Sequence, residues 1–212
     1  RGGFAGLTVE IGALNQDSTF SGNFQTAALT LRKIGAGTLT LSGSVAYTGP
    51  TEVNGGVLSV TGTIPGGGTM NVNTNAKLAG TGTVGSAVIV NAGGRVAPGT
   101  TGIGTLTVGS LTLAQGGGLA FDLGAADASD KVLTSGALTL DGLSFADCVF
   151  TAAAGFGNGT YVLVDAASVI GSLGTVASGR LPSGKRGKFV VDAENGNLLL
   201  EVTNMGTMVR LQ

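Results

Sequence analysis

The stretch from Lys33 to Val60 decides the fold, and it reads KIGAGTLTLSGSVAYTGPTEVNGGVLSV. Residues 38–41, 51–53 and 57–60 alternate polar and apolar side chains, the period typical of half-buried β-strands. The separators between these segments are rich in Gly, with Asn and Pro, and such residues favour turns because they tolerate or fix unusual backbone angles. The stretch therefore predicts three short strands joined by tight turns.

The same stretch resembles the autotransporter-associated β-strand repeat of bacterial secreted and surface proteins. The resemblance rests on Gly35–Gly43 (GAGTLTLSG), Tyr47–Gly49 (YTG) and Val53–Gly56 (VNGG), with Ala46 where the family usually has Asn. It implies a right-handed parallel β-helix on an exported protein, usually an elongated stalk or passenger. A secreted or cell-surface location follows from that resemblance.

The composition also indicates an all-β protein. The 212 residues include 40 Gly and only four Pro, yet 42% are hydrophobic, which is too many for a disordered Gly-rich linker. A chain that is rich in Gly but still apolar must turn often between short strands. The formal net charge of −1 offers no basic field for nucleic acid, and no run of 18 apolar residues provides a transmembrane helix.

Weak repeats indicate the size of one coil. The motif that starts at Val53 recurs at Val72 and at Val90, with spacings of 19 and 18 residues. Such a spacing fits one solenoid coil, whereas antiparallel hairpins would recur at about half that distance. We expect the three valines to stack inward on successive coils, and the asparagines that follow them to occupy equivalent corners: Asn54, Asn73 and Asn91. At roughly 20 residues per coil the chain would form about ten coils.

A second recurring unit is Leu-Thr-Leu, at 39–41, 111–113 and 138–140. It supports the interpretation of the chain as a repeat protein.

The sequence thus predicts an all-β fold, a right-handed parallel β-helix (β-solenoid) with a C-terminal antiparallel cap. Residues 1–142 would form the coils, and residues 143–212 the terminal coils and the antiparallel capping region of one continuous domain. Asn195-Gly196 is a strong hairpin signal between two apolar segments. Residues 165–172 are interpreted as a helical turn or a loop.

The chain has no His, which excludes Ser-His-Asp and Cys-His nucleophiles and imidazole metal sites. A pair of carboxylates could still hydrolyse a sugar. The densest acidic set is Asp122, Asp127, Asp130 and Asp141. We expect Asp127, Ser129 and Asp130 to satisfy local backbone groups in a turn, with Asp127 and Asp130 as weak candidates for a bound cation. No catalytic or cofactor-binding residue is predicted.

Cys148 is the only cysteine, and it lies in an apolar, strand-like context. A buried inert thiol is the simpler interpretation, and an intermolecular disulfide or reactive thiol is the alternative.

Four of the eleven basic residues fall within nine positions: Arg180, Lys185, Arg186 and Lys188. A solvated loop is the simpler interpretation of this segment. Contact with an acidic partner surface or an anionic glycan is the alternative.

Three functions are compatible with this pattern. The first is a non-catalytic extracellular structural protein, either a stalk or passenger segment or a fibre subunit of a bacterial surface. The second is an adhesin that binds glycan or host protein, and the third is a β-helical carbohydrate-active enzyme. The strand at 7–11 has no evident polar cap, so its edge would recruit another protein segment or a second subunit, head to tail. Since the chain opens at Arg1 without a charged region leading into an apolar one, we expect any export signal to have been removed or to lie outside this sequence.

Overall fold

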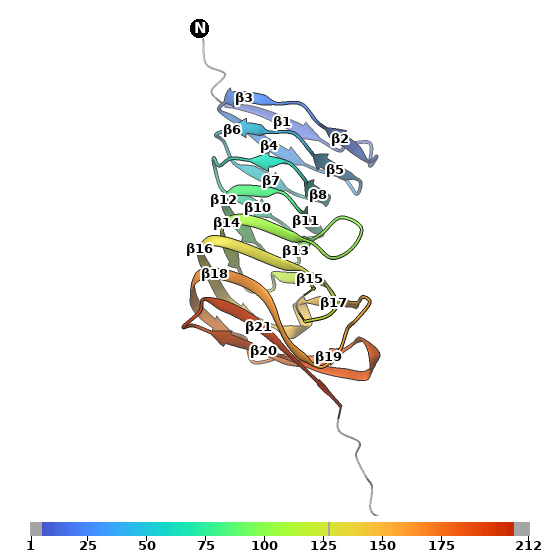
Figure 1. Cartoon of the computed structure of the whole chain (residues 1–212). Helices are drawn as coiled ribbons and strands as arrows, with labels where there is room; N and C mark the ends of the chain where they lie inside the picture. The colour runs from blue at the N-terminus through green and yellow to red at the C-terminus, as the bar shows by residue number, and fades with distance from the viewer. Residues whose placement is uncertain (1–5, 127, 206–212) are drawn as a thin grey trace, which may run out of the picture.

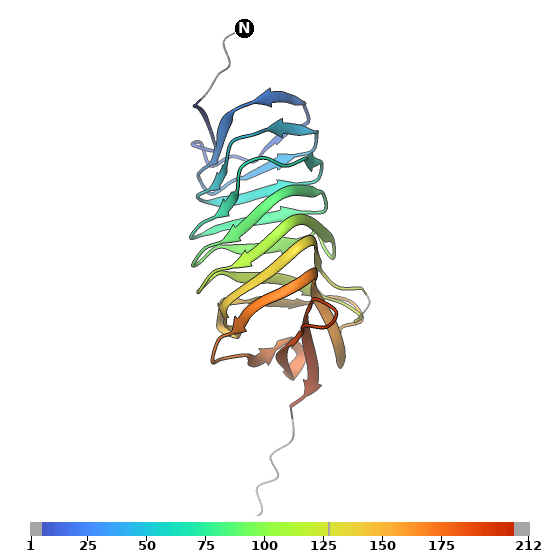
Figure 2. The same ribbon diagram turned by 90° about the vertical axis from the view of Figure 1, so that its left-hand side faces the viewer.

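The computed structural model describes residues 6–126 and 128–205, without the side chains of residues 24–27. These residues form an elongated stack of β-coils, with the N-terminal coil at one end and an antiparallel unit at the other (Figures 1 and 2). The described residues contain no α-helix, only two short 3-10 helices, η1 (Phe145–Asp147) and η2 (Pro182–Gly184). The prediction of a β-solenoid with a C-terminal antiparallel part is confirmed.

The largest sheet has twelve strands. In order these are β1 (Leu7–Ile11), β4 (Leu29–Lys33), β7 (Thr51–Val53), β10 (Met70–Val72), β12 (Thr83–Val90), β14 (Thr105–Leu113), β16 (Lys131–Leu143), β18 (Gly159–Leu173), β21 (Asn197–Asn204), β20 (Lys185–Asp192) and β19 (Ser178–Leu181), with β9 (Thr63–Ile64) paired to β12. From β1 to β18 every neighbouring pair in this order is parallel. From β18 to β19 every pair is antiparallel.

Two further sheets complete the coils. The seven-stranded sheet holds β17 (Val149–Ala152), β15 (Gly118–Leu123), β13 (Arg95–Pro98), β11 (Ala76–Gly80), β8 (Gly56–Val60), β5 (Thr38–Leu41) and β2 (Ser18–Phe20), and the two-stranded sheet holds β3 (Phe24–Ala27) and β6 (Val45–Tyr47). All of their pairs are parallel.

The parallel register places one inward residue of each coil directly above the next. Val72 pairs with Val53 on one side and with Val90 on the other, and all three have 0% exposure, so the predicted stacking is confirmed. The column runs through Ile11, Lys33, Val53, Val72, Val90, Leu113 and Leu140, and Leu140 pairs in turn with Gly171. Because a single coil cannot cover its own apolar face, this stacking forms the core.

The number of coils is smaller than predicted. The solenoid makes about six turns rather than about ten. Val90 pairs with Leu113 and Leu113 with Leu140, so the later coils are longer than the 18 or 19 residues between the valines. The extra residues include the loop at 99–104 and the loop residues 124–126 and 128–130, and the chain after Leu173 no longer adds parallel coils.

The Leu-Thr-Leu segments occupy two different sheets. Residues 39–41 lie in the seven-stranded sheet, whereas residues 111–113 and 138–140 pair with each other in the large sheet. Each of these leucines points inward, since every face of the solenoid buries the same alternation. The tripeptide therefore marks a buried strand but not its face.

Glycines allow neighbouring coils to approach at the corners. A Cβ on Gly37 would lie 2.5 Å from the carbonyl oxygen of Gln16 on the preceding coil. Gly56 adopts a φ of +60°, and a Cβ there would lie 2.4 Å from the carbonyl oxygen of Gly37. These contacts explain why Gly recurs in the stretch that predicts the fold.

Strands β18, β21, β20 and β19 form the antiparallel unit. Residues 193–196 connect β20 to β21, with Asp192 opposite Asn197 and Gly196 at a φ of 73°, which confirms the predicted hairpin. Residues 165–172 were expected to be a helical turn or a loop, but they belong to strand β18. Their pairing with β16 explains the difference, because tertiary pairing outweighs the weak strand propensity of Ala and Gly.

Candidate functional site

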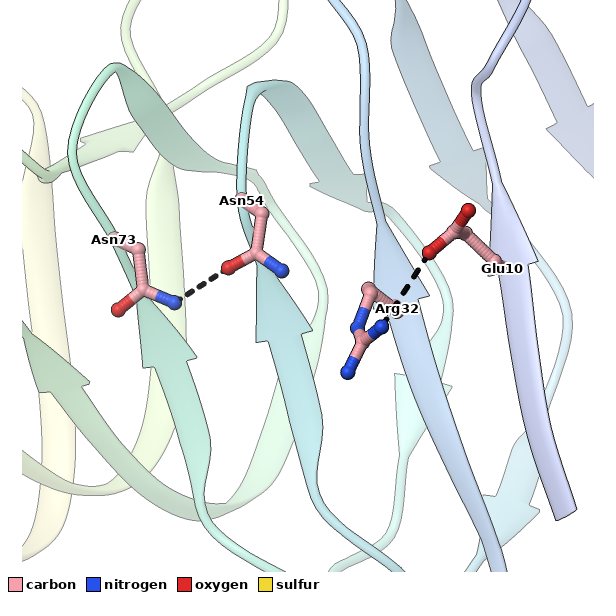
Figure 3. A network of polar contacts seen from close by, with 4 residues as sticks. All are labelled: Glu10, Arg32, Asn54 and Asn73. Atoms are coloured by element: carbon pink, nitrogen blue, oxygen red, sulfur yellow. Dashed lines mark hydrogen bonds and ion pairs between the residues drawn. The ribbon is translucent and has the colours of Figure 1, made fainter.

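Three asparagines form a hydrogen-bonded ladder along one corner of the solenoid. The amide nitrogen of Asn73 donates to Oδ1 of Asn54 at 2.7 Å, as Figure 3 shows, and Asn91 donates to Oδ1 of Asn73 at 2.7 Å. The predicted equivalence of these corners is therefore confirmed. The ladder links three successive coils through side chains, in addition to the backbone pairing.

Charged side chains continue this polar face towards the N-terminal coil. Glu52 accepts hydrogen bonds from the amide nitrogens of Asn71 at 2.8 Å and Asn73 at 3.1 Å. On the first two coils Arg32 lies 3.5 Å from Glu10, and both side chains are about half exposed (Figure 3). Since exposed ion pairs are screened by water, this pair adds little stability.

Lys33 is a charged residue in the otherwise apolar column. Its side chain is 1% exposed, and its ammonium group donates to three carbonyl oxygens: Ile34 at 2.7 Å, Gly35 at 3.0 Å and Gly55 at 3.1 Å. Burial lowers the pKa of this amine, and the nearby negative charge of Asp17 partly opposes that effect. The ammonium group thus satisfies backbone carbonyls on two coils, a role that the sequence analysis did not assign.

A groove runs across the outer face of the seven-stranded sheet. It has a volume of about 610 Å³ and extends from β5 to β17, and its walls and floor include Thr40, Ser59, Lys77, Ala97 and Thr151. The groove-lining residues on consecutive strands are small: Thr40, Ser59, Ala79 and Ala97, which are paired in that order, and Ala120. Small side chains on consecutive strands leave the hollow, and their hydroxyl groups offer hydrogen bonds.

The loop at residues 99–104 forms one wall of the groove. Gly99 and Gly80 exchange backbone hydrogen bonds of 2.9 Å at one end of the loop. The side chain of Ile103 lies against Gly124, where a Cβ would come within 2.6 Å of its Cδ1 atom. Near the other end, Gly104 donates its backbone N–H to Asp130 at 2.8 Å. The wall is therefore held by three separate contacts.

Asp130 lies in this groove but is engaged by the backbone. It is 1% exposed, and its two oxygens accept hydrogen bonds from the N–H groups of Gly104 and Asp122, each at 2.8 Å. Burial raises its pKa to about 6, although both hydrogen bonds favour the ionised form. The expected role in satisfying backbone groups is confirmed for Asp130, and also for Ser129, which bonds to Gly124 and Ala125.

The other acidic candidates do not form a compact set with Asp130. Asp122 lines the groove beside it, and Asp141 is exposed on β16. Asp127, the second cation candidate, lies outside the described residues. Across 6–126 and 128–205, no group of three or more Cys, Asp or Glu side chains is placed to hold a metal ion.

The basic residues are divided between two sides of the hairpin β19–β20. Arg180 and Arg186 are direct cross-strand partners, and Lys188 lies two residues further on the same outward face. Lys185 instead donates to Oδ1 of Asn158 at 2.9 Å and of Asn204 at 3.1 Å. The predicted loop is therefore mostly strand, and it brings three of the four cations to one face.

Cys148 immediately precedes β17 and is half-buried. Its Sγ lies 3.7 Å from the carbonyl oxygen of Ser144. Burial raises the pKa of the thiol to about 12, so it stays protonated at neutral pH. This environment fits the interpretation as an inert thiol.

The two ends of the solenoid differ. In the first coil Val9, Ile11 and Phe20 are only half-buried, whereas Leu31 and Leu41, which pair with Val9 and Phe20, are 2% and 1% exposed. Among the described residues, β1, β2 and β3 each end their sheet, with a neighbour on one side only.

The opposite end is closed by aromatic rings. The ring of Phe145 lies 5.4 Å from that of Phe150 and 5.1 Å from that of Phe189. Gly179 and Gly187 leave room for Phe145, because a Cβ on either would approach its ring to 2.3 or 3.0 Å. Strand β19 contacts η1 and the 3-10 helix η2 contacts β17, so the antiparallel unit covers this cluster in part, and Phe150 stays half-buried.

The comparisons with known proteins agree with this geometry. Residues 31–60 match a family model described as passenger-associated-transport-repeat, and this segment runs from β4 to β8. No curated protein sequence matches the chain. In the part of the chain that the structure describes, no helix is long and apolar enough to cross a membrane. The repeat match and the β-solenoid together fit a protein built on the autotransporter-associated β-helix repeat.

Proposed function

We propose that this chain is a non-catalytic structural segment of a secreted or cell-surface protein. In this role it is a rigid β-solenoid stalk or passenger region that holds other parts of the protein apart. The repeat match at residues 31–60 and the unbroken parallel column from Ile11 to Leu140 support the proposal. A rod needs stacking along its whole length rather than a single site.

The difference between the two ends is the observation that carries the proposal. The half-buried Val9, Ile11 and Phe20 leave apolar surface and strand edges that a further coil would cover. At the other end Phe145 and Phe189 are 7% and 2% exposed, although Phe150 on β17, which also ends its sheet, is half-buried. We infer that parallel coils from the same polypeptide or from another subunit continue beyond β1, and that the antiparallel unit terminates the rod.

Negative-stain microscopy of the native full-length protein tests this role. A Fab fragment raised against the hairpin β19–β20 would mark the closed end in each particle. We expect a rod that extends away from the Fab for longer than about six coils. A compact particle without a rod, or a Fab in the middle of a continuous rod, would contradict the proposal.

A catalytic role makes a different prediction. The two groove carboxylates would have to act as acid and base, but both oxygens of Asp130 already accept backbone hydrogen bonds. We therefore expect the purified protein to leave polysaccharides intact. Cleavage that is lost in Asp122→Asn or Asp130→Asn, but not in Asp141→Asn, would show that the non-catalytic assignment is wrong.

Glycan adhesion is a second candidate function, favoured by the hydroxyl-lined groove of about 610 Å³. A polysaccharide chain laid along the groove would meet Thr40, Ser59 and Thr151 on different coils. Binding on a glycan array that is lost in Ala97→Phe, which fills the groove, would support this function. Loss in Arg186→Ala alone would place the glycan on the basic hairpin instead.

Head-to-tail filaments are a third arrangement, in which a second copy covers β1. The closing hairpin would have to supply the complementary surface, because the antiparallel unit covers the last coil in part. Sedimentation velocity at increasing concentration tests this arrangement. A stable monomer at high concentration excludes it, without affecting the stalk role.

A further inference from the structure

We propose that Arg180 and Arg186 bind the phosphate monoester group of a saccharide at the closed end of the solenoid. The two arginines lie directly opposite each other on β19 and β20, and both are exposed. Like charges in this position destabilise an antiparallel pair. An anion between them would remove the repulsion, and this inference does not depend on the proposed stalk function.

The surrounding residues do not neutralise the two guanidinium groups. Within the described ranges, neither arginine forms an ion pair with a carboxylate, in contrast to Arg32 with Glu10. The carboxylate nearest along the pairing belongs to Glu201, which is the partner of Lys188. Two positive charges therefore remain available at this end of the molecule.

One of the guanidinium groups is already oriented. Nη2 of Arg186 donates to Oγ of Ser178 at 3.1 Å, across the hairpin. This bond restrains a long side chain, so less conformational entropy is lost when a ligand binds. Arginine also presents paired N–H donors that match the oxygens of phosphate, which lysine does not.

A pocket of about 420 Å³ adjoins the two arginines. It is lined by Gly179, Arg180, Arg186, Asn204 and Met205. This volume exceeds what a bare phosphate needs and lies in the range of sites for small organic ligands. Oδ1 of Asn204 accepts from Lys185, so its amide nitrogen is left to donate to a ligand hydroxyl. Met205, which is 42% exposed, offers an apolar contact for one face of a sugar ring.

The charge of the site selects the ligand class. A phosphate monoester carries nearly two negative charges at neutral pH and matches two guanidinium groups. A carboxylated sugar carries one charge and would leave half of the repulsion in place. The pocket beside the arginines then accommodates the sugar that bears the phosphate.

The test is a titration of the ¹⁵N-labelled protein with glucose 1-phosphate at low ionic strength. We expect saturable chemical-shift changes at Ser178, Arg180, Arg186 and Asn204, which weaken as salt is added. Arg180→Gln and Arg186→Gln should each weaken binding at least tenfold. Arg32→Gln is the matched control, because it removes an arginine on the first two coils, and binding should be unchanged.

Further probes give the outcomes that would overturn the inference. If glucuronate binds as tightly as glucose 1-phosphate, the site does not select phosphate. If inorganic phosphate binds as tightly as glucose 1-phosphate, the sugar contributes nothing to binding. Selective binding to phosphatidic acid vesicles, without binding of glucose 1-phosphate, would replace the saccharide by a lipid. Arg180→Gln should melt at the same temperature as the wild type or higher, because repulsion is removed; a lower melting temperature would show that the arginines are structural.

Discussion

The ammonium group of Lys33 lies 3.1 Å from the carbonyl oxygen of Gly55, one coil further along the solenoid. Two more carbonyl oxygens accept from the same group. We expect Lys33→Met to lower the free energy of unfolding by about 1–2 kcal/mol, since three acceptors lose a charged donor while the aliphatic stem is kept. Urea unfolding at neutral pH measures this change.

The pH dependence of the same variant provides a second check. Burial lowers the pKa of Lys33 from 10.5, so the unfolded state binds more protons than the folded state just below that pH. The wild type should therefore gain stability relative to Lys33→Met as the pH rises towards 10.5. If the stability difference between the wild type and Lys33→Met shrinks as the pH rises towards 10.5, the assignment of Lys33 as a buried, charged residue is wrong.

The corner ladder predicts an order among asparagine variants. Asn73 takes part in hydrogen bonds with Asn54, Glu52 and Asn91, whereas the side chain of Asn71 bonds to Glu52 alone among the described residues. We expect Asn73→Ala to cost about 1–2 kcal/mol and Asn71→Ala about half of that. Thermal unfolding of the two variants tests the order, and equal effects would show that the ladder adds nothing beyond a single bond.

A charge within the valine column should be far more damaging than one on the surface. Val72 has 0% exposure, so Val72→Asp would bury an unpaired carboxylate and lower the free energy of unfolding by about 3–5 kcal/mol. Ala87→Asp places the same charge on an exposed position of β12 and should change stability little. Guanidinium unfolding compares the two. Similar losses would mean that the column is not the core.

Asp130 should make stability depend on pH between about 4 and 6. The pKa of Asp130 is about 6 in the folded protein and 3.8 in the unfolded chain, so the folded state holds the proton more tightly. The stability linked to this proton is fully present below pH 3.8 and is lost as the pH rises through 6. These values set an upper bound of about 3 kcal/mol on the loss.

Asp130→Asn removes this titration. The difference in unfolding free energy between the wild type and the variant should therefore decrease from pH 3.5 to pH 7, when melts are compared across that range. Asp141→Asn is the control, because Asp141 is exposed. A pH-independent difference for Asp130→Asn would contradict the buried carboxyl group.

Cys148 should react slowly in the folded protein. With a thiol pKa of about 12, only a minute fraction is thiolate at pH 8, and the thiolate is the reactive form. We expect iodoacetamide to label Cys148 readily only after unfolding in guanidinium chloride. Rapid labelling of the native protein, measured by mass spectrometry, would show a reactive thiol.

The sequence predicts the solenoid because the same residue types return at nearly constant spacing. The sequence reveals Val53, Val72 and Val90 because each fills the same inward position. It reveals the asparagines that follow them because each lies at the same corner. The spacing ceases to be informative after Val90, where inserted loops lengthen the coils to reach Leu113. An extrapolated spacing therefore overestimates the number of coils.

The candidate sites depend on contacts that lie further apart in the sequence. The groove wall relies on Asp130 and Gly104, which are 26 residues apart, and no local pattern indicates that contact. Lys33 is a charged residue at a position that the alternation assigns to the core, and only the carbonyl groups of two coils make that position suitable. The pairing of Arg180 with Arg186 requires a hairpin, whereas Gly and Pro in the segment indicated a loop.

The equal register of Val53 and Val72 has a consequence for the length of the rod. Strand β10 repeats the edge of strand β7, and both strands end in an inward valine, Val72 and Val53. Duplicating or deleting the 19 residues from Asn54 to Val72 would shift everything that follows by one strand spacing along the axis and leave both ends intact. Genetic recombination can therefore change the length of such a rod by whole coils, and each added coil uses the same core packing.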